Sequence, residues 1–192
     1  MSKAQLRASL RLKRRNLDSA TRQYMDQKIN AAVLDLVEEA GFTKLAAFWP
    51  FDGEPDLRPA LKQLDKLNIQ IALPVIDVEQ AEPAMLFRVW TTTGELKKNR
   101  FGIEEPVNGE LISPDSLDLL LTPLLAWDVH GHRLGMGAGY YDRALSHMRD
   151  MPTPVRTGVA YDLQRTDSIP TDPWDIDLHL VLTEKGRFTC LP

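Results

Sequence analysis

The sequence has a single cysteine, Cys190, and no apolar run that approaches the length of a membrane span. An intrachain disulfide is therefore excluded, and we expect a cytoplasmic protein without a membrane partner. Cysteine and histidine never cluster with the spacing of zinc ligands. Any metal is therefore expected to be magnesium held by oxygen atoms.

Acidic side chains are missing from the first 17 residues, which carry six basic ones. The six are Lys3, Arg7, Arg11, Lys13, Arg14 and Arg15. The remainder holds 17 basic against 27 acidic residues, a balance of −10, which argues against a nucleic-acid partner. Leu6, Leu10 and Leu17 recur at helical spacing and favour a basic helix over about residues 3–16 whose cations meet a polyanionic ligand. A targeting segment or a plain solvated face are the alternatives.

A chain of 192 residues, 43% of them hydrophobic, is expected to form one domain with a proper core. Helices are predicted over residues 3–16, 19–40, 57–67 and 140–148. Strands are predicted over residues 44–49, 69–74, 85–90 (as an edge strand), 117–125, 155–161 and 181–183. This alternation indicates a three-layer α/β/α domain with a mostly parallel sheet and helices on both faces.

Some boundaries and connections can also be predicted. Ser19 or Thr21 is expected to cap the second helix, and Gly41 to end it. Residues 77–83 and 96–106 are expected to be loops, the latter at the surface.

Residues 133–143, RLGMGAGYYDR, are the most informative stretch. Three glycines at alternate positions suit a turn whose backbone lies close to a ligand, and a buried strand precedes them while a helix follows. Backbone amides of such a turn can bind phosphate, although the spacing fits neither the P-loop nor the dinucleotide fingerprint. Arg133 would clamp an anion, and Asp142 could hold a metal. A tight connection without a ligand is the alternative.

A second stretch follows the predicted strand at 44–49 and contains Trp49, Phe51 and Glu54. Ligands of α/β sheets lie beyond the carboxyl ends of the strands, where these side chains are expected. Ordinary core packing is the alternative for the two aromatic residues.

Taken in order, residues 3–7, 48–54, 99–106, 118–143 and 175–184 resemble the 5-formyltetrahydrofolate cyclo-ligases, also called methenyltetrahydrofolate synthetases. The glycine block is the most specific part of this resemblance. The resemblance implies ATP-dependent closure of 5-formyltetrahydrofolate to 5,10-methenyltetrahydrofolate, with release of ADP and phosphate. The formyl oxygen would be phosphorylated and N10 would attack the activated carbon.

The resemblance also implies roles for individual residues. ATP binding falls to Lys3, Ala4, Gln5, Leu6, Arg7, Arg133, Leu134, Gly135, Met136, Gly137, Ala138, Gly139, Tyr140 and Tyr141. Folate binding falls to Trp49, Glu54, Met136, Gly137, Ala138, Gly139 and Tyr140. Catalytic roles fall to Arg133, Tyr140 and Asp142, Mg²⁺ binding to Asp142 and Asp175, and a looser contact with substrate or phosphate to Arg100.

Two features separate this sequence from the family pattern. Met136 and Ala138 stand where many relatives carry a basic residue, so phosphate binding would rely on backbone amides, other cations and the metal. Asp177 competes with Asp175 as the second metal ligand. An inactive folate- or nucleotide-binding protein and a sugar-phosphate isomerase are the rival functions, and we expect a monomer that binds small molecules.

Overall fold

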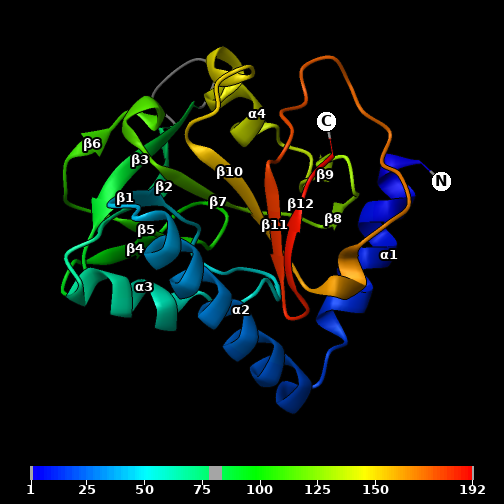
Figure 1. The fold of residues 1–192 in the computed structure, drawn as a ribbon, viewed down its shortest axis with the longest axis horizontal. Coiled ribbons are helices and arrows are strands. Elements are labelled where there is room, and N and C mark those ends of the chain that lie inside the picture. The colour runs from blue at the N-terminus through cyan, green and yellow to red at the C-terminus, as the bar shows by residue number, and fades with distance from the viewer. Residues whose placement is uncertain (1, 78–83, 192) are drawn as a thin grey trace.

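The computed structural model describes residues 2–77 and 84–191, and Figure 1 shows a twisted sheet flanked by helices. The helices are α1 (Lys3–Arg15), α2 (Ser19–Ala40), α3 (Arg58–Lys66) and α4 (Tyr140–Ala144), with 3₁₀ turns at Pro114–Ser116, Ser146–Met148 and Asp162–Gln164. The main-sheet strands are β1 (Lys44–Ala46), β2 (Gln70–Asp77), β3 (Ala84–Trp90), β6 (Leu111–Ile112), β7 (Leu119–Pro123), β10 (Val155–Val159), β11 (Leu180–Thr183) and β12 (Gly186–Thr189). Two small hairpins pair β4 (Leu96–Lys98) with β5 (Glu104–Pro106), and β8 (Ala126–Trp127) with β9 (Arg133–Leu134).

The main sheet has the order β12-β11-β10-β7-β1-β2-β3-β6. Strands β11, β10, β7, β1 and β2 are parallel, whereas β12, β3 and β6 pair antiparallel with their neighbours. Parallel strands covered on both faces are apolar throughout, and Leu119, Leu120 and Leu121 of β7 are fully buried. The predicted mixed, mostly parallel sheet is therefore confirmed.

Helices cover both faces of the sheet, which confirms the three-layer arrangement. On one face, Val33 of α2 and Leu61 of α3 share a hydrophobic cluster with Leu45 of β1. On the other face, Leu145 and Met148, which follow α4, pack in a second cluster with strand residues. No helix within the described residues has the length and apolarity needed to cross a membrane.

Local chemistry sets the boundaries of α1 and α2. Gln5 and Ser2 form a capping box at the start of α1. Asp18, rather than the expected Ser19 or Thr21, caps α2 by accepting from the Thr21 amide at 2.9 Å. Gly41 ends α2 in the left-handed conformation, φ +66°, as predicted.

Several predicted elements need correction. Residues 96–106 form the β4–β5 hairpin rather than an irregular loop, because Asn99 Oδ1 stabilises the turn by accepting from the Phe101 amide at 2.8 Å and the Ile103 amide at 3.1 Å. Strand β3 is not at the edge, since β6 pairs with it, and β12 rather than β11 ends the sheet. Of the predicted loop 77–83, Asp77 belongs to β2 and residues 78–83 lie outside the described part.

Several elements are shorter than predicted, among them β1, β7, β10 and α4. Strand β1 ends at Ala46, three residues before the predicted end. Helix α4 ends at Ala144, where the Ser146 hydroxyl donates to the Arg143 carbonyl at 3.0 Å and a 3₁₀ turn replaces the helix.

Candidate active site

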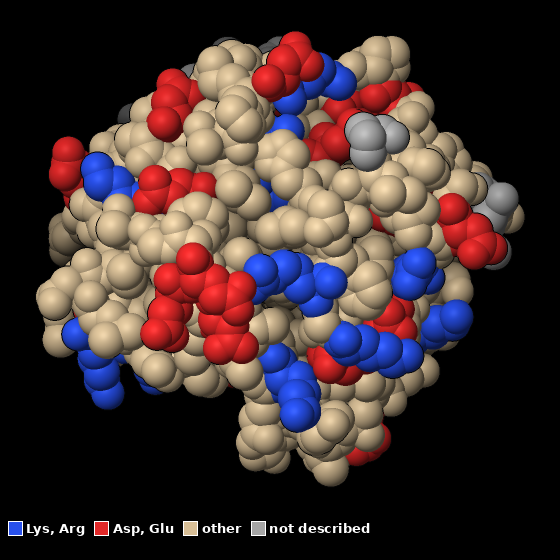
Figure 2. All heavy atoms as spheres, in the orientation of Figure 1, with Lys and Arg blue, Asp and Glu red and all other residues tan. Residues whose placement is uncertain are grey.

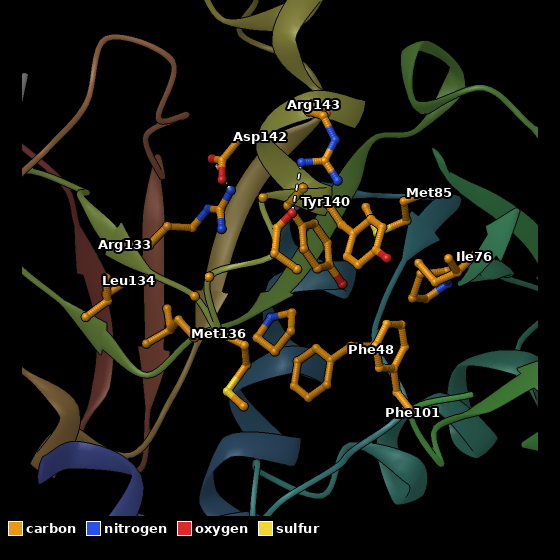
Figure 3. A pocket seen from close by; sticks show the side chains of 18 of the residues that line it. Phe48, Ile76, Met85, Phe101, Arg133, Leu134, Met136, Tyr140, Asp142 and Arg143 are labelled. Atoms are coloured by element: carbon orange, nitrogen blue, oxygen red, sulfur yellow. Dashed lines mark hydrogen bonds and ion pairs between the residues drawn. The ribbon is translucent and has the colours of Figure 1, made fainter. Parts of the chain in front are cut away.

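A cavity of about 790 Å³ opens beyond the carboxyl ends of β1 and β7, within the size range of small-molecule sites. Its lining comes from residues near 3–7, 48–54, 99–105, 133–143 and 172–175, which are far apart in the sequence. Figure 3 places Arg133 and Asp142 on one side, and Phe48, Ile76, Met85 and Phe101 on the other. We call these the polar wall and the apolar wall.

All residues of the glycine block line the cavity. The strand that leads into it is β9, because the β8–β9 hairpin lies between the buried strand β7 and the glycines, contrary to prediction. Gly137 has φ +100° and Gly139 φ +67°, values that side-chain-bearing residues rarely adopt. Gly139 directly precedes α4, so the order of glycine turn and helix is as predicted.

Arg133 and Asp142 form an ion pair on the polar wall, with 2.6 Å between Nη2 and Oδ1. The same Oδ1 accepts from the Ile176 amide at 3.1 Å. Arg133 also lies over the Tyr141 ring, 5.6 Å from its centroid. Burial, together with the charge of Glu54, raises the pKa of Tyr141, which keeps this phenol neutral.

The first turns of α1 add two cations to the same wall. Lys3 Nζ contacts Asp172 at 2.6 Å and Asp175 at 2.9 Å. Burial alone would lower the pKa of Lys3, but the two carboxylates outweigh it and raise that pKa. Arg7 donates to the Gly135 carbonyl at 3.0 Å, and a Cβ on Gly137 would lie 3.4 Å from its guanidinium carbon.

The rest of the predicted segment 3–7 does not reach the cavity. Ala4 and Gln5 are exposed, whereas Leu6 packs beside Leu10 in a small cluster with the β8–β9 hairpin. Lys3 and Arg7 are one helical turn apart and therefore face the same way. The predicted nucleotide segment thus contributes two side chains.

The last turns of α1 contact the protein itself, which corrects the expectation that all its cations meet a ligand. Arg11 Nε lies 2.6 Å from Asp52 Oδ2, Arg15 pairs with Oδ1, and Arg14 donates to the Asp52 carbonyl at 3.0 Å. Arg14 is fully buried and the Asp52 side chain is 2% exposed. Figure 2 shows the basic side chains over α1 with acidic ones beside them.

Asp142 and Asp175 have the chemistry to hold a metal ion. Asp142 Oδ2 and Asp175 Oδ1 form no hydrogen bond within the described residues, although the partner oxygen of each is bonded. Magnesium is commonly held by one or two carboxylates with phosphate and water, so this pair fits it. Among the described residues, no group of three or more His, Cys, Asp and Glu side chains is arranged to hold a metal. Asp177 is exposed and does not line the cavity.

Trp49 and Glu54 also line the cavity. Trp49 Nε1 donates to Glu104 Oε2 at 2.7 Å, which fixes the indole ring. Glu54 Oε2 accepts from the Phe51 amide at 3.0 Å, and Oε1 lies 4.0 Å from Arg14. Burial raises the pKa of Glu54 to about 7, although Arg14 opposes the shift.

Tyr140 lies between the two walls, and its hydroxyl accepts from Arg100 Nη2 at 3.1 Å. Arg100 does not line the cavity but lines a neighbouring hollow of about 430 Å³.

Sequence reasoning missed several lining residues. The missed set includes Phe48, Ile76, Met85, Asn99, Phe101, Ile103, Glu105 and Asp172. Ile76 and Met85 face each other across β2 and β3. The available signal was the apolar pair Val75 and Ile76 directly after Pro74, because β2 extends to Asp77 rather than ending at that proline.

Comparison with known proteins gives a consistent result. The model of the 5-formyltetrahydrofolate cyclo-ligase family matches residues 1–184. The chain is 36% identical over 177 residues to the Escherichia coli 5-formyltetrahydrofolate cyclo-ligase, covering 91% of this chain and 96% of the relative. It is 33% identical over 180 residues to the Haemophilus influenzae enzyme of that name, covering 93% and 95%. The solved Aquifex aeolicus 5,10-methenyltetrahydrofolate synthetase matches with a TM-score of 0.85 and 33% identity, covering 100% of this chain and 94% of that one.

Proposed function

This chain belongs to the 5-formyltetrahydrofolate cyclo-ligase family, and we propose that it uses ATP to close 5-formyltetrahydrofolate to 5,10-methenyltetrahydrofolate. The observation that carries the proposal is the division of one cavity into two unlike walls. Cations and a glycine turn suit a triphosphate, whereas aromatic side chains with one carboxyl group suit a pterin.

The nucleotide would lie against the polar wall. Amides of residues 135–139 would bind the phosphates, and Arg133, Lys3 and Arg7 would neutralise their charge. Met136 and Ala138 bring no charge to this turn, so the two cations from α1 take a larger share. Leu134 is buried and would shape the base of this site rather than bind phosphate, whereas the half-buried Tyr141 would border the phosphates.

Asp142 and Asp175 would hold Mg²⁺, with their unbonded oxygens Oδ2 and Oδ1 as ligands. Such an ion would neutralise charge on the phosphates during transfer. Arg133 and Lys3 already hold the other oxygen of each carboxylate, so they would fix the two groups in position before the ion arrives.

The folate would lie against the apolar wall and reach the glycine turn. Glu54 would accept hydrogen bonds from ring N–H groups of the pterin, and the ring of Trp49 would pack against it. Residues 136–140 border both walls, so they would contact both substrates where the formyl oxygen meets the γ-phosphate.

The reaction would then proceed in two steps. The formyl oxygen attacks the γ-phosphorus and ADP leaves, which converts a poor leaving group into a phosphate ester. N10 then attacks the formyl carbon, loses its proton, and the C–O bond breaks to release phosphate. Arg133 would stabilise the transferred phosphoryl group, Asp142 would hold Arg133 in place, and Tyr140 would orient the formyl group through its hydroxyl.

Absorbance of methenyltetrahydrofolate in the near ultraviolet tests the proposal. Purified protein receives 5-formyltetrahydrofolate and Mg²⁺, with and without ATP, and we expect absorbance to rise only with ATP. Folate binding without turnover would favour an inactive binding protein. Binding of neither substrate would reject the proposal and reopen the isomerase alternative. Monomeric state and cytoplasmic location stay predictions.

A further inference from the structure

Trp174 is a large aromatic side chain that remains 66% exposed and lines the cavity. By contrast, Trp90 and Trp127 are 3% and 1% exposed, and Trp49 is hydrogen-bonded through its indole nitrogen. Exposed aromatic surface at the rim of a cavity is typical of a binding surface, because hydrophobic burial would otherwise favour covering it.

The backbone around Trp174 is held firmly even though the side chain is open. The Asp175 amide donates to the Asp172 carbonyl at 3.0 Å, which closes a tight turn around residues 173 and 174. The Asp172 amide donates to Asp175 Oδ2 at 2.8 Å, and Arg149 Nη2 donates to the Pro173 carbonyl at 2.6 Å. Lys3 bridges the two carboxylates of the turn. The indole therefore projects from a fixed support, which lowers the entropy cost of binding a ligand.

This turn belongs to the polar wall. The ion pair between Lys3 and Asp175 connects the turn to the start of α1. Ile176, the residue after Asp175, donates its amide to Asp142 Oδ1. The aromatic residues of the apolar wall come from other segments, after β1 and in the β4–β5 hairpin. Trp174 thus stands beside the side chains that would bind phosphate, away from those that would bind the pterin.

We propose that the indole of Trp174 is the surface on which the nucleobase of the bound triphosphate stacks. The inference rests on the proposed use of ATP and names the part of the site that recognises the base. Flat heterocycles stack on exposed aromatic rings regardless of their hydrogen-bonding edges. We therefore expect the enzyme to accept other purine triphosphates and to discriminate against pyrimidine triphosphates, whose rings overlap the indole less.

The test compares Trp174→Ala and Trp174→Phe with the parent protein. For each protein, we would measure the KM for ATP, the KM for 5-formyltetrahydrofolate and the inhibition constant of inorganic tripolyphosphate. Tripolyphosphate shares the phosphate contacts of ATP but has no base. Tyr24→Ala is the matched control, because Tyr24 is also 60% exposed but does not line the cavity.

We expect Trp174→Ala to raise the KM for ATP roughly 5- to 100-fold, the range that base–aromatic stacking covers. The tripolyphosphate inhibition constant and the folate KM should stay unchanged, and Trp174→Phe should recover most of the loss. ATP should also quench the tryptophan fluorescence of the parent protein, and Trp174→Phe should abolish that quenching.

Three results would overturn the inference. These are an unchanged KM for ATP in Trp174→Ala, an equal loss of tripolyphosphate inhibition, or a rise in the folate KM alone. Failure of the proposed function is a different result, namely a parent protein that neither turns over nor binds ATP. If the parent binds ATP without turnover, calorimetric ATP affinities of the same variants decide the question.

Discussion

The first turns of α1 and its last turns both carry basic side chains and no acidic ones, yet they contact different partners. Lys3 and Arg7 line the cavity. Arg11, Arg14 and Arg15 converge on one carboxylate, Asp52, in the loop after β1. A single basic helix therefore divides into a cavity-facing half and a half that attaches it to the protein.

The difference shows that charge density by itself does not identify a ligand site. Burial would raise the pKa of Asp52, but the bonds from Arg11 and Arg15 outweigh it and hold that pKa below its usual range. Asp52 is therefore a permanent anion that satisfies three cations inside the fold. Variants of each half should separate stability from catalysis.

The largest effect is expected from Arg14→Met. This change removes the fully buried cation and leaves Asp52 and Glu54 without it, which should lower the free energy of unfolding by about 3–5 kcal/mol. Urea denaturation at pH 7 measures the loss. Lys3→Met, from the other half of α1, is the control and should change stability by less than about 1 kcal/mol. Equal stability of both variants would contradict the division of the helix.

A smaller effect should appear in Glu54→Gln as a change in pH dependence. The pKa of Glu54 is raised from 4.5 to about 7, so the stability it contributes is full below pH 4.5 and is lost as the pH rises through 7. Glutamine stays neutral and abolishes this loss. At pH 8.5 the variant should therefore be more stable than the parent by about 3 kcal/mol, and at pH 4 the two should be equal.

The carboxylates of Asp52 and Glu54 differ in how closely they contact the arginines of α1. Asp52 contacts three of them, whereas Arg14, at 4.0 Å, is the arginine that pairs with Glu54 within the part of the chain that the structure describes. Unfolding curves at pH 4, 6 and 8.5 give the test. If the free energy of unfolding of the parent does not fall relative to that of the variant between pH 4 and 8.5, ionisation of Glu54 does not destabilise the fold.

Arg7→Met should weaken ATP binding and leave the free energy of unfolding unchanged. Losing one charge-assisted bond to phosphate is expected to raise the KM for ATP about 10-fold, equivalent to about 1.4 kcal/mol. Initial rates at saturating folate measure the change, and thermal unfolding provides the control. A lower melting temperature without any change in KM would place Arg7 with the attaching half of the helix.

The smallest effect is expected from Arg15→Gln. Arg15 pairs with Asp52 but is 53% exposed, and Arg11 and Arg14 still hold the carboxylate. The free energy of unfolding should fall by no more than about 1 kcal/mol, with ATP and folate kinetics unchanged. If Arg15→Gln lowered the free energy of unfolding as much as Arg14→Met, the exposure of an arginine would not determine how strongly its ion pair with Asp52 stabilises the protein.

Much of the fold was predictable because its signals are local. Apolar runs such as 119–123 mark strands buried on both faces, and Gly41 marks a helix end. The β4–β5 hairpin and the outer strands β6 and β12 were not predicted, because short strands gain stability from partners distant in sequence.

The candidate site was predictable where a motif is continuous. Residues 133–143 were expected at a ligand site, and all of them line the cavity. Phe101 and Asp172 were missed because they reach the cavity through loops whose path depends on tertiary contacts. The sequence could not distinguish the role of Arg7 from that of Arg11. Arg11 contacts Asp52 and Arg7 contacts the glycine turn, and this difference depends on where the fold places Asp52.

The contacts of Lys3 have a consequence for the order of events during protein synthesis. Its partners Asp172 and Asp175 follow it by 169 and 172 residues. Helix α1 leaves the ribosome first, but the wall it helps to build is incomplete until those aspartates have emerged. Contacts of such long sequence separation close last because ordering the intervening chain costs entropy. The cavity wall that Lys3 helps to form can therefore be completed only after the segment containing Asp172 and Asp175 has been synthesised.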